Sequence, residues 1–280
     1  DVIVILKTRP PARHTLDEPK GLGPVDCVDL VVSETSGGLR LADRPVLYAD
    51  EIEETAKAMV TVVEDSLALL EGETIEIVAV PPFVSRDLTR TSDYLQRAYA
   101  RLIEQMLLSG KGLLVVDVTE ADAISHELLL AGNGNSPQRP LPLYLLGEYR
   151  HADGGVGKPD APFNIVRLTF KRGTKVLATI EKQDLAFSTV PVFLRESVQD
   201  FISRVAVKAQ IPNPVQEVRQ LTEWSDTFYR IGNYAEALDL CEAGLLLDDQ
   251  QKELRAKAVM SSCEAALALG ESATKGAFLQ

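Results

Sequence analysis

Histidine, cysteine and tryptophan are scarce in this chain, whose 280 residues include three His, three Cys and one Trp. The cysteines form no CxxC pair, so the sequence contains neither a zinc ribbon nor a thioredoxin-type redox motif. The histidines also lack the spacing of metal ligands. These residues are Cys27, Cys241 and Cys263, and His14, His126 and His151. The sequence therefore predicts no metal site and no cofactor.

Long apolar runs are absent as well. No stretch approaches the roughly 18 to 20 consecutive apolar residues that span a bilayer, so we expect no transmembrane segment in this chain. The chain starts with Asp1 and passes at once into residues 2–6 (VIVIL), which are typical of a buried strand. This start predicts a processed or trimmed product, with any membrane anchor outside the chain.

Positive charge is in the minority, because 29 Lys and Arg face 41 Asp and Glu and the formal charge is -12. Such a balance repels a phosphate backbone and an anionic membrane surface, so we expect no nucleic-acid partner. The densest group of basic residues is interpreted as a solvated helix face rather than a binding patch. It consists of Arg86, Arg90, Arg97 and Arg101.

The composition, 45% hydrophobic and 25% charged, is that of a folded globular protein. The residue pattern divides the chain into three regions, residues 1–72, 73–209 and 215–280. The first is a small α/β region in which apolar runs predict strands and a helix ends near Gly72. One face of this helix is an apolar stripe that we expect to be buried. The stripe consists of Ile52, Ala56, Met59, Val60, Val63 and Leu67.

The second region alternates strand and helix patterns. Residues 75–80 and 113–116 are apolar runs separated by a helical pattern, and a strand-helix-strand unit of this length favours parallel pairing. Later strands at 163–170 and 176–180 are joined by a predicted hairpin turn at 171–174 (KRGT). The stiff segment 210–214 (QIPNP) marks the end of the region. We therefore expect an α/β fold with a mixed sheet, followed by an all-α unit.

The third region resembles a tetratricopeptide repeat at the turn between its two helices, in residues 230–238 (RIGNYAEAL). In such a repeat the glycine allows a tight turn, the tyrosine packs across both helices and the alanine is small where the helices cross. The predicted packing residues are Trp224, Phe228, Gly232, Tyr234 and Ala237. Gly244 and Asp249 depart from the usual Ala and Pro, which makes this a degenerate copy. We expect residues 253–269 to form a further helix that caps it.

The motifs that could suggest catalysis are incomplete or have a structural explanation. Residues 154–158 (GGVGK) lack the other residues of a phosphate-binding loop, and residues 132–136 (GNGNS) are interpreted as a helix end and turn. The sequence contains no GxSxG motif. Asp117 and Glu120 sit at a helix start, where capping explains them. The sequence therefore predicts no catalytic residues and no enzyme.

The middle region resembles, over about residues 75–205, the soluble α/β domain shared by the curli secretion-channel lipoproteins and the amino-terminal part of the propeller protein of the Tol system. Residues 77–83 (IVAVPPF) are similar to the family strand IAVxPF, and residues 144–149 (YLLGEY) are similar to a later strand. The order and spacing of the segments carry the resemblance. The remaining matches are 102–109 with 113–117, 121–129, 163–180 and 193–205.

These resemblances imply a non-enzymatic bacterial envelope protein, located in the periplasm or cell envelope, that acts as a scaffold or adaptor in assembly or secretion. Its partners are expected to be proteins, including further copies of itself as a homo-oligomer. We expect partner contacts on the first helix of the repeat, at Glu223, Asp226 and Arg230. Two alternatives stay open: a structural subunit of a cell-surface or cell-wall assembly, and a nucleotide-binding protein or enzyme that uses the Gly-rich loops.

Overall fold

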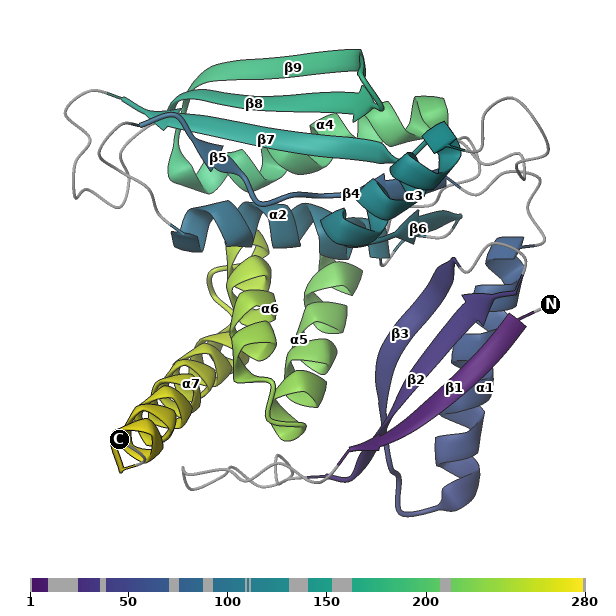
Figure 1. Cartoon of the computed structure of the whole chain (residues 1–280). Coiled ribbons are helices and arrows are strands. Elements are labelled where there is room, and N and C mark those ends of the chain that lie inside the picture. The colour runs from purple at the N-terminus through teal and green to yellow at the C-terminus, as the bar shows by residue number, and fades with distance from the viewer. Residues whose placement is uncertain are drawn as a thin grey trace. The chain divides into compact units, whose positions relative to one another are not determined.

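The computed structural model describes residues 2–9, 25–35, 39–70, 76–87, 93–108, 110, 112–130, 141–152, 163–206 and 213–278. In these residues the chain is a mixed α/β protein with two β-sheets (Figure 1). It divides into two compact units, one of Asp1–Ala68 with Val218–Gln280 and one of Leu69–Glu217. Each unit is described below by itself.

The first unit contains a three-stranded antiparallel sheet in the order β1-β2-β3 and a helix that follows it. The elements are β1 (Val2–Arg9), β2 (Cys27–Glu34), β3 (Arg40–Leu47) and α1 (Ile52–Leu70). In the central strand β2, alternate residues such as Leu30 and Val32 are buried, as a sheet with one covered face requires. The register places Val4 opposite Val32 and Leu6 opposite Leu30.

The burial expected for two apolar segments of this unit is wrong. Residues 2–6 do form a strand, but β1 lies at the edge of the sheet, and its side chains from Ile3 to Leu6 are 43 to 55% exposed. The stripe on α1 is largely exposed too, since Ile52 is 82% and Val60 53% exposed. Among the described strands β1 is covered on one side only, by β2, so its side chains stay more exposed than those of the central strand β2.

The other helices of the first unit are α5 (Pro214–Arg230), α6 (Tyr234–Leu247) and α7 (Lys252–Phe278), although the first residues of α5, up to Glu217, belong to the second unit. Helices α5 and α6 are joined by a three-residue turn, and α6 packs along α7. Their shared core is built from Val218, Leu221, Leu240, Cys241 and Leu254.

The second unit is a six-stranded mixed sheet with helices. Its elements are β4 (Glu76–Ala79), β5 (Val84–Ser85), α2 (Asp93–Leu108), β6 (Leu113–Val115), α3 (Val118–Leu130), β7 (Leu143–His151), β8 (Phe163–Arg172), β9 (Lys175–Leu185), the 3-10 helix η1 (Phe187–Thr189) and α4 (Val190–Val205). The main strand order is β6-β4-β7-β8-β9, with β5 paired to β7.

The pairing of these strands confirms two predictions. Strands β4 and β6, which flank α2, are parallel, and β8 and β9 form an antiparallel hairpin. The hairpin turns at Gly173, whose φ of 57° is the left-handed conformation that glycine adopts without a steric penalty. Strand β4 is also parallel to β7, so β4 has a neighbour on each side.

Alternate residues of β7 separate the two faces of this sheet. Leu143, Leu145 and Tyr149 are buried on the face toward α2 and α4. Tyr144 points to the other face, where its hydroxyl donates a hydrogen bond of 2.6 Å to Asp122 of α3. Figure 1 shows α3 in front of β4 and β6. On the buried face, Phe170 of β8 stacks on Phe201 of α4 with ring centroids 3.9 Å apart.

Candidate functional site

The turn between α5 and α6 is closed by Gly232. Its φ is 78°, and its backbone N–H donates to the Tyr229 carbonyl (2.9 Å), while the N–H of Asn233 donates to the Phe228 carbonyl (2.9 Å). These bonds satisfy carbonyl groups at the end of α5 in the manner of a glycine-terminated helix. The side chain of Asn233 then accepts a bond from the backbone of Glu236 and caps α6.

The other predicted packing residues lie along the interface of these helices. Tyr234 is 8% exposed and meets Tyr229 edge to face at 5.5 Å, and Ala237 is fully buried beside them. Trp224 and Phe228 are half-buried against the core of Leu221, Leu240 and Ala243.

The glycine at position 244, which departs from the repeat pattern, has a local explanation. A Cβ atom at this position would lie 2.6 Å from Cδ1 of Leu254, a distance at which something must shift. Leu254 belongs to α7 and is fully buried. The absence of a side chain at Gly244 therefore lets α7 pack closely on α6.

Helix α7 also holds α5 through a buried cation. Lys257, whose side chain is only 6% exposed, forms ion pairs with Asp226 of α5 and with Glu253 one turn earlier in α7. The neighbouring Cys241 is fully buried, and desolvation raises the pKa of its thiol to about 11. The buried ammonium group of Lys257 needs its two ion pairs, because an uncompensated charge in the interior is costly.

The three predicted partner residues therefore differ in their surroundings. Asp226 is turned toward α7, where it pairs with Lys257. Glu223 is exposed and forms an ion pair of 2.9 Å with Arg219 one turn earlier, with side chains 61% and 83% exposed. Arg230, in the last turn of α5, is half-buried. We call the exposed surface around Arg219 and Glu223 the α5 face.

In the second unit a polar group that the sequence did not reveal lies beside the aromatic core. Nδ1 of His151 is 2.7 Å from a carboxylate oxygen of Asp87, which also accepts from the hydroxyl of Ser85 (3.2 Å). Burial works against ionisation of Asp87, but the hydrogen bonds from His151 and Ser85 outweigh it and hold the pKa of this carboxyl below its usual value.

This arrangement is structural in character. The His151 ring lies 4.7 Å from Phe163 and 5.6 Å from Tyr149, so the imidazole extends the aromatic core. Asp87 and His151 are 64 residues apart, and no local spacing signals their pairing. Among the described residues no three His, Cys, Asp or Glu side chains gather as metal ligands.

Alternating charges cross the more exposed face of the same sheet. Glu148 of β7 pairs with Arg86, which follows β5, and lies 3.5 Å from Arg167 of β8, which pairs in turn with Glu181 of β9 (2.6 Å). Arg86 is thus a strand-end residue with an acidic neighbour and does not belong to a helix face, while Arg101 pairs with Glu104 on α2. The grouping predicted for these arginines on one helix is wrong for Arg86.

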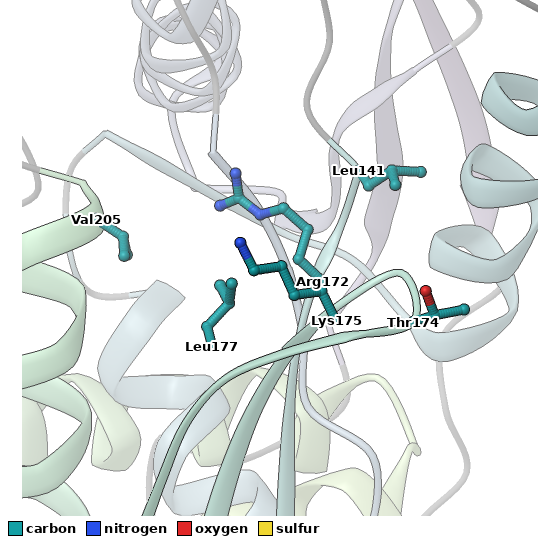
Figure 2. A pocket seen from close by; sticks show the side chains of 6 residues that line it. All are labelled: Leu141, Arg172, Thr174, Lys175, Leu177 and Val205. Carbon is teal, nitrogen blue, oxygen red and sulfur yellow. The ribbon is translucent and has the colours of Figure 1, made fainter.

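An open hollow of about 600 Å³ lies at the β8–β9 hairpin (Figure 2). Figure 2 shows the guanidinium of Arg172 and the amine of Lys175 extending into the same space, with aliphatic side chains around them. Arg172 is already compensated by Glu76, whose pKa burial raises despite this pairing. The lining residues are Leu141, Arg172, Thr174, Lys175, Leu177 and Val205.

The remaining sequence motifs lie away from the groups described above or outside the described residues. Asp117 caps α3, because its carboxylate accepts a 2.7 Å bond from the backbone of Glu120, which confirms the capping interpretation. The Gly-rich segments 132–136 and 154–158, together with His14 and Arg90, lie outside the described residues. Within the part of the chain that is described, no helix combines the length and the apolar character that crossing a membrane requires. Comparison with protein-family models and with curated proteins returns no match for this chain.

Proposed function

We propose that this chain is a non-enzymatic bacterial envelope protein, acting in the periplasm or at the cell envelope as a scaffold or adaptor that binds a protein partner through the α5 face. The observation that carries the proposal is the α5–α6 pair, closed at Gly232 and backed by α7, which leaves Arg219 and Glu223 exposed.

The packing of these helices supports a tetratricopeptide-like unit. Gly232 forms the tight turn, Tyr234 is wedged against Tyr229, and Ala237 is buried without a large side chain. Helix α7 covers α6 and pairs with α5 through Lys257, as a capping helix does at the end of a solenoid. Units of this kind present one helix face to a protein partner.

The order of elements in the second unit supports the resemblance to the curli-channel and Tol modules. A parallel strand-helix-strand unit is followed by a helix, three antiparallel strands and a closing helix. The segment 77–83 supplies β4 and ends at Phe83, whose ring fills the space beside Gly147.

The charges on the α5 face are not needed to hold the fold together. An exposed ion pair one helical turn apart contributes only about 0.3 to 0.5 kcal/mol to stability. Arg219 and Glu223 form such a pair, in contrast to the buried Lys257. Their side chains can therefore exchange this weak contact for a contact with a partner.

The α5 face can be tested by exchanging its charges without changing the net charge. We would compare the wild-type chain with the double variant Arg219→Glu, Glu223→Arg in chemical cross-linking to envelope extracts, quantifying each captured protein. The matched control is Asp200→Arg, Arg204→Asp, which exchanges another exposed ion pair one turn apart, on α4. We expect the α5 exchange to lower capture of a specific partner at least tenfold and the control to leave it unchanged. Equal capture by all three chains would contradict the proposal.

The repeat itself is tested by Tyr234→Ala. Because Tyr234 is buried between α5 and α6, its truncation is expected to lower the free energy of unfolding by about 3 to 5 kcal/mol. Chemical denaturation measures this value directly. A nearly neutral effect would remove the repeat from the proposal.

Nucleotide binding, the alternative function, is tested by thermal melting with added ATP or GTP. A ligand that binds only the folded state raises the melting temperature, and the shift keeps growing with the logarithm of ligand concentration above the dissociation constant. We expect no shift, and a shift that grows with nucleotide concentration would favour the alternative.

A further inference from the structure

Strand β1 has the features of a strand that pairs with another chain. It lies at the edge of its sheet, hydrogen-bonded to β2 along its whole length, and no other described strand pairs with it. An edge strand presents a row of unpaired backbone N–H and C=O groups, and natural proteins usually protect such a row with charges, proline or bulges. In β1, by contrast, residues 2–6 are all aliphatic.

Both faces of β1 are open. Val4 and Leu6 lie on the face of the buried residues Val32 and Leu30, yet they are 43% and 55% exposed. Ile3 and Ile5 lie on the opposite face and are 53% and 43% exposed. A strand paired to the free edge would place its own side chains beside these on both faces.

Further exposed apolar side chains occur in the same part of the chain as β1. Of the sixteen large apolar side chains that are exposed in the described residues, eight belong to residues 3–67. They are Ile3, Val4, Ile5, Leu6, Tyr48, Ile52, Val60 and Leu67. Four of the eight belong to the continuous segment Ile3–Leu6, so β1 is where exposed apolar side chains are densest.

We propose that β1 pairs antiparallel with β1 of a second copy of this chain, joining the two three-stranded sheets across a two-fold axis at Val4. In this register Val4 faces Val4 of the other copy, Ile3 faces Ile5, and Val2 faces Leu6. Each aliphatic residue of the segment 2–6 then meets another aliphatic residue. A two-fold contact of this kind is self-complementary and closed, which limits the assembly at this edge to a dimer.

The charges around β1 fit a second copy. Its basic residues are Lys7 and Arg9, and Arg9 is already paired with Asp29 at 2.8 Å. Both basic residues lie at the C-terminal end of β1, so antiparallel pairing about Val4 keeps those of the two copies apart, whereas parallel pairing would bring them together.

The first test measures mass in solution by light scattering over a dilution series of the whole chain. We expect a dimer of twice 30.6 kDa that dissociates on dilution. Ile3→Lys is expected to raise the dimer dissociation constant at least tenfold, because it places a charge at an apolar edge. The matched control is Val176→Lys on β9, since Val176 is 55% exposed on the edge strand of the other sheet. This control is expected to leave the dissociation constant unchanged.

A chain that stays monomeric at all concentrations would overturn the proposal, and so would a dimer that Ile3→Lys does not weaken. Capture of a different protein by a monomeric chain at β1 would also overturn it, because the occupant would then not be a second copy. Circular dichroism of each variant establishes that it is folded before its mass is interpreted.

The second test reads the register and does not depend on disrupting the dimer. In a Cys263→Ser background, which removes the exposed native thiol, Val4→Cys is expected to form an intermolecular disulfide on mild oxidation. Directly opposed residues of antiparallel strands have Cβ atoms about 5 Å apart. Leu6→Cys is the control, because residue 6 of one copy is four residues, about 13 Å, from residue 6 of the other in this register. Equal cross-linking at both positions would overturn the proposed pairing.

This inference uses a surface other than the α5 face, so the two proposals fail separately. Loss of dimer in Ile3→Lys with unchanged partner capture would leave the adaptor proposal intact. Loss of capture in the α5 exchange variant with an unchanged dimer mass would remove the adaptor proposal and leave the β1 dimer.

Discussion

Strands β1 and β4 both contain a short aliphatic run, but among the described strands β4 has a neighbour on each side and β1 pairs with β2 alone. In β4 Ile77, Val78 and Ala79 are at most 1% exposed, whereas the side chains from Ile3 to Leu6 in β1 are all more than 40% exposed. The difference does not come from residue type. It comes from the position of each strand in its sheet, because a central strand is covered by its neighbours and by helices while an edge strand is covered on one side.

One edge strand of the larger sheet, β9, shows how an edge strand is usually protected. Strand β9 (Lys175–Leu185) carries both basic and acidic residues along its length, and Glu181 pairs with Arg167 on the adjacent strand. Its two exposed aliphatic residues, Val176 and Leu177, lie beside Lys175. Strand β1 lacks charges within residues 2–6, so the two edges differ in the feature that discourages pairing.

The largest expected effect is a difference in stability between Ile→Ala substitutions in β4 and in β1. Ile77→Ala in β4 should lower the free energy of unfolding by about 2 to 5 kcal/mol, because a buried side chain is removed. Ile5→Ala in β1 should cost about 1 kcal/mol or less when the protein is dilute enough to be monomeric. Urea unfolding of both variants measures the difference. Similar costs at the two positions would break the comparison.

The buried Cys241 and the exposed Cys263 should differ in how they make the stability of the protein depend on pH. Burial raises the pKa of Cys241 from about 9 to about 11, so the unfolded thiol ionises first as the pH rises. The stability that this group contributes is full below about pH 9 and is lost toward pH 11, a change of about 2 to 3 kcal/mol.

This loss is measured by denaturation of the wild type and of Cys241→Ala between pH 8 and 11. The variant should show a shallower fall in stability than the wild type. Cys263→Ala, at an exposed position, should follow the wild type, and an identical slope for all three chains would contradict the assignment.

Tight packing around Gly147 in the larger sheet predicts that one added methyl group lowers the stability of the protein. A Cβ atom at Gly147 would lie 2.3 Å from the ring of Phe83, so Gly147→Ala should destabilise the protein by about 1 to 3 kcal/mol. Thermal or chemical unfolding gives the value. In the double variant Gly147→Ala, Phe83→Leu the loss of stability should be smaller than the sum of the two single losses, because the smaller side chain at position 83 makes room for the new methyl group. Losses that simply add would argue against this contact.

The smallest expected effect concerns Asp87. Its pKa is lowered in the folded protein, so its ionised form stabilises the fold above the unfolded pKa near 4, and this contribution is lost as the pH falls through the folded value. Asp87→Asn should cost about 1 kcal/mol at neutral pH and less at pH 3. Asp43→Asn, which removes a half-exposed partner of Arg40, is the control and should have no measurable effect. A constant cost from pH 7 to 3 would contradict the role of the charge.

Much of the secondary structure was predictable because its signals are local. The hairpin turn at residues 171–174 and the parallel pairing of β4 with β6 both follow from short segments and the length of chain between them. Capping of α3 by Asp117 was predictable for the same reason, since the two groups are three residues apart.

The side-chain contacts between distant segments were not predictable. His151 meets Asp87 across 64 residues, and Lys257 of α7 meets Asp226 of α5. Asp226 looked like a surface residue in the sequence because its partner lies in another helix. The apolar stripe of α1 also appeared suited to burial, but Ile52 and Val60 are more than half exposed in the folded unit.

The sequence by itself determined where strands and helices form, because periodicity, glycine and capping residues act within a few positions. It also determined the turn at Gly232 and the aliphatic character of residues 2–6. The tertiary structure decided which of these apolar residues are buried. Burial depends on neighbours that are distant in the chain, and within the described part of the chain β1 has a neighbour on one side only.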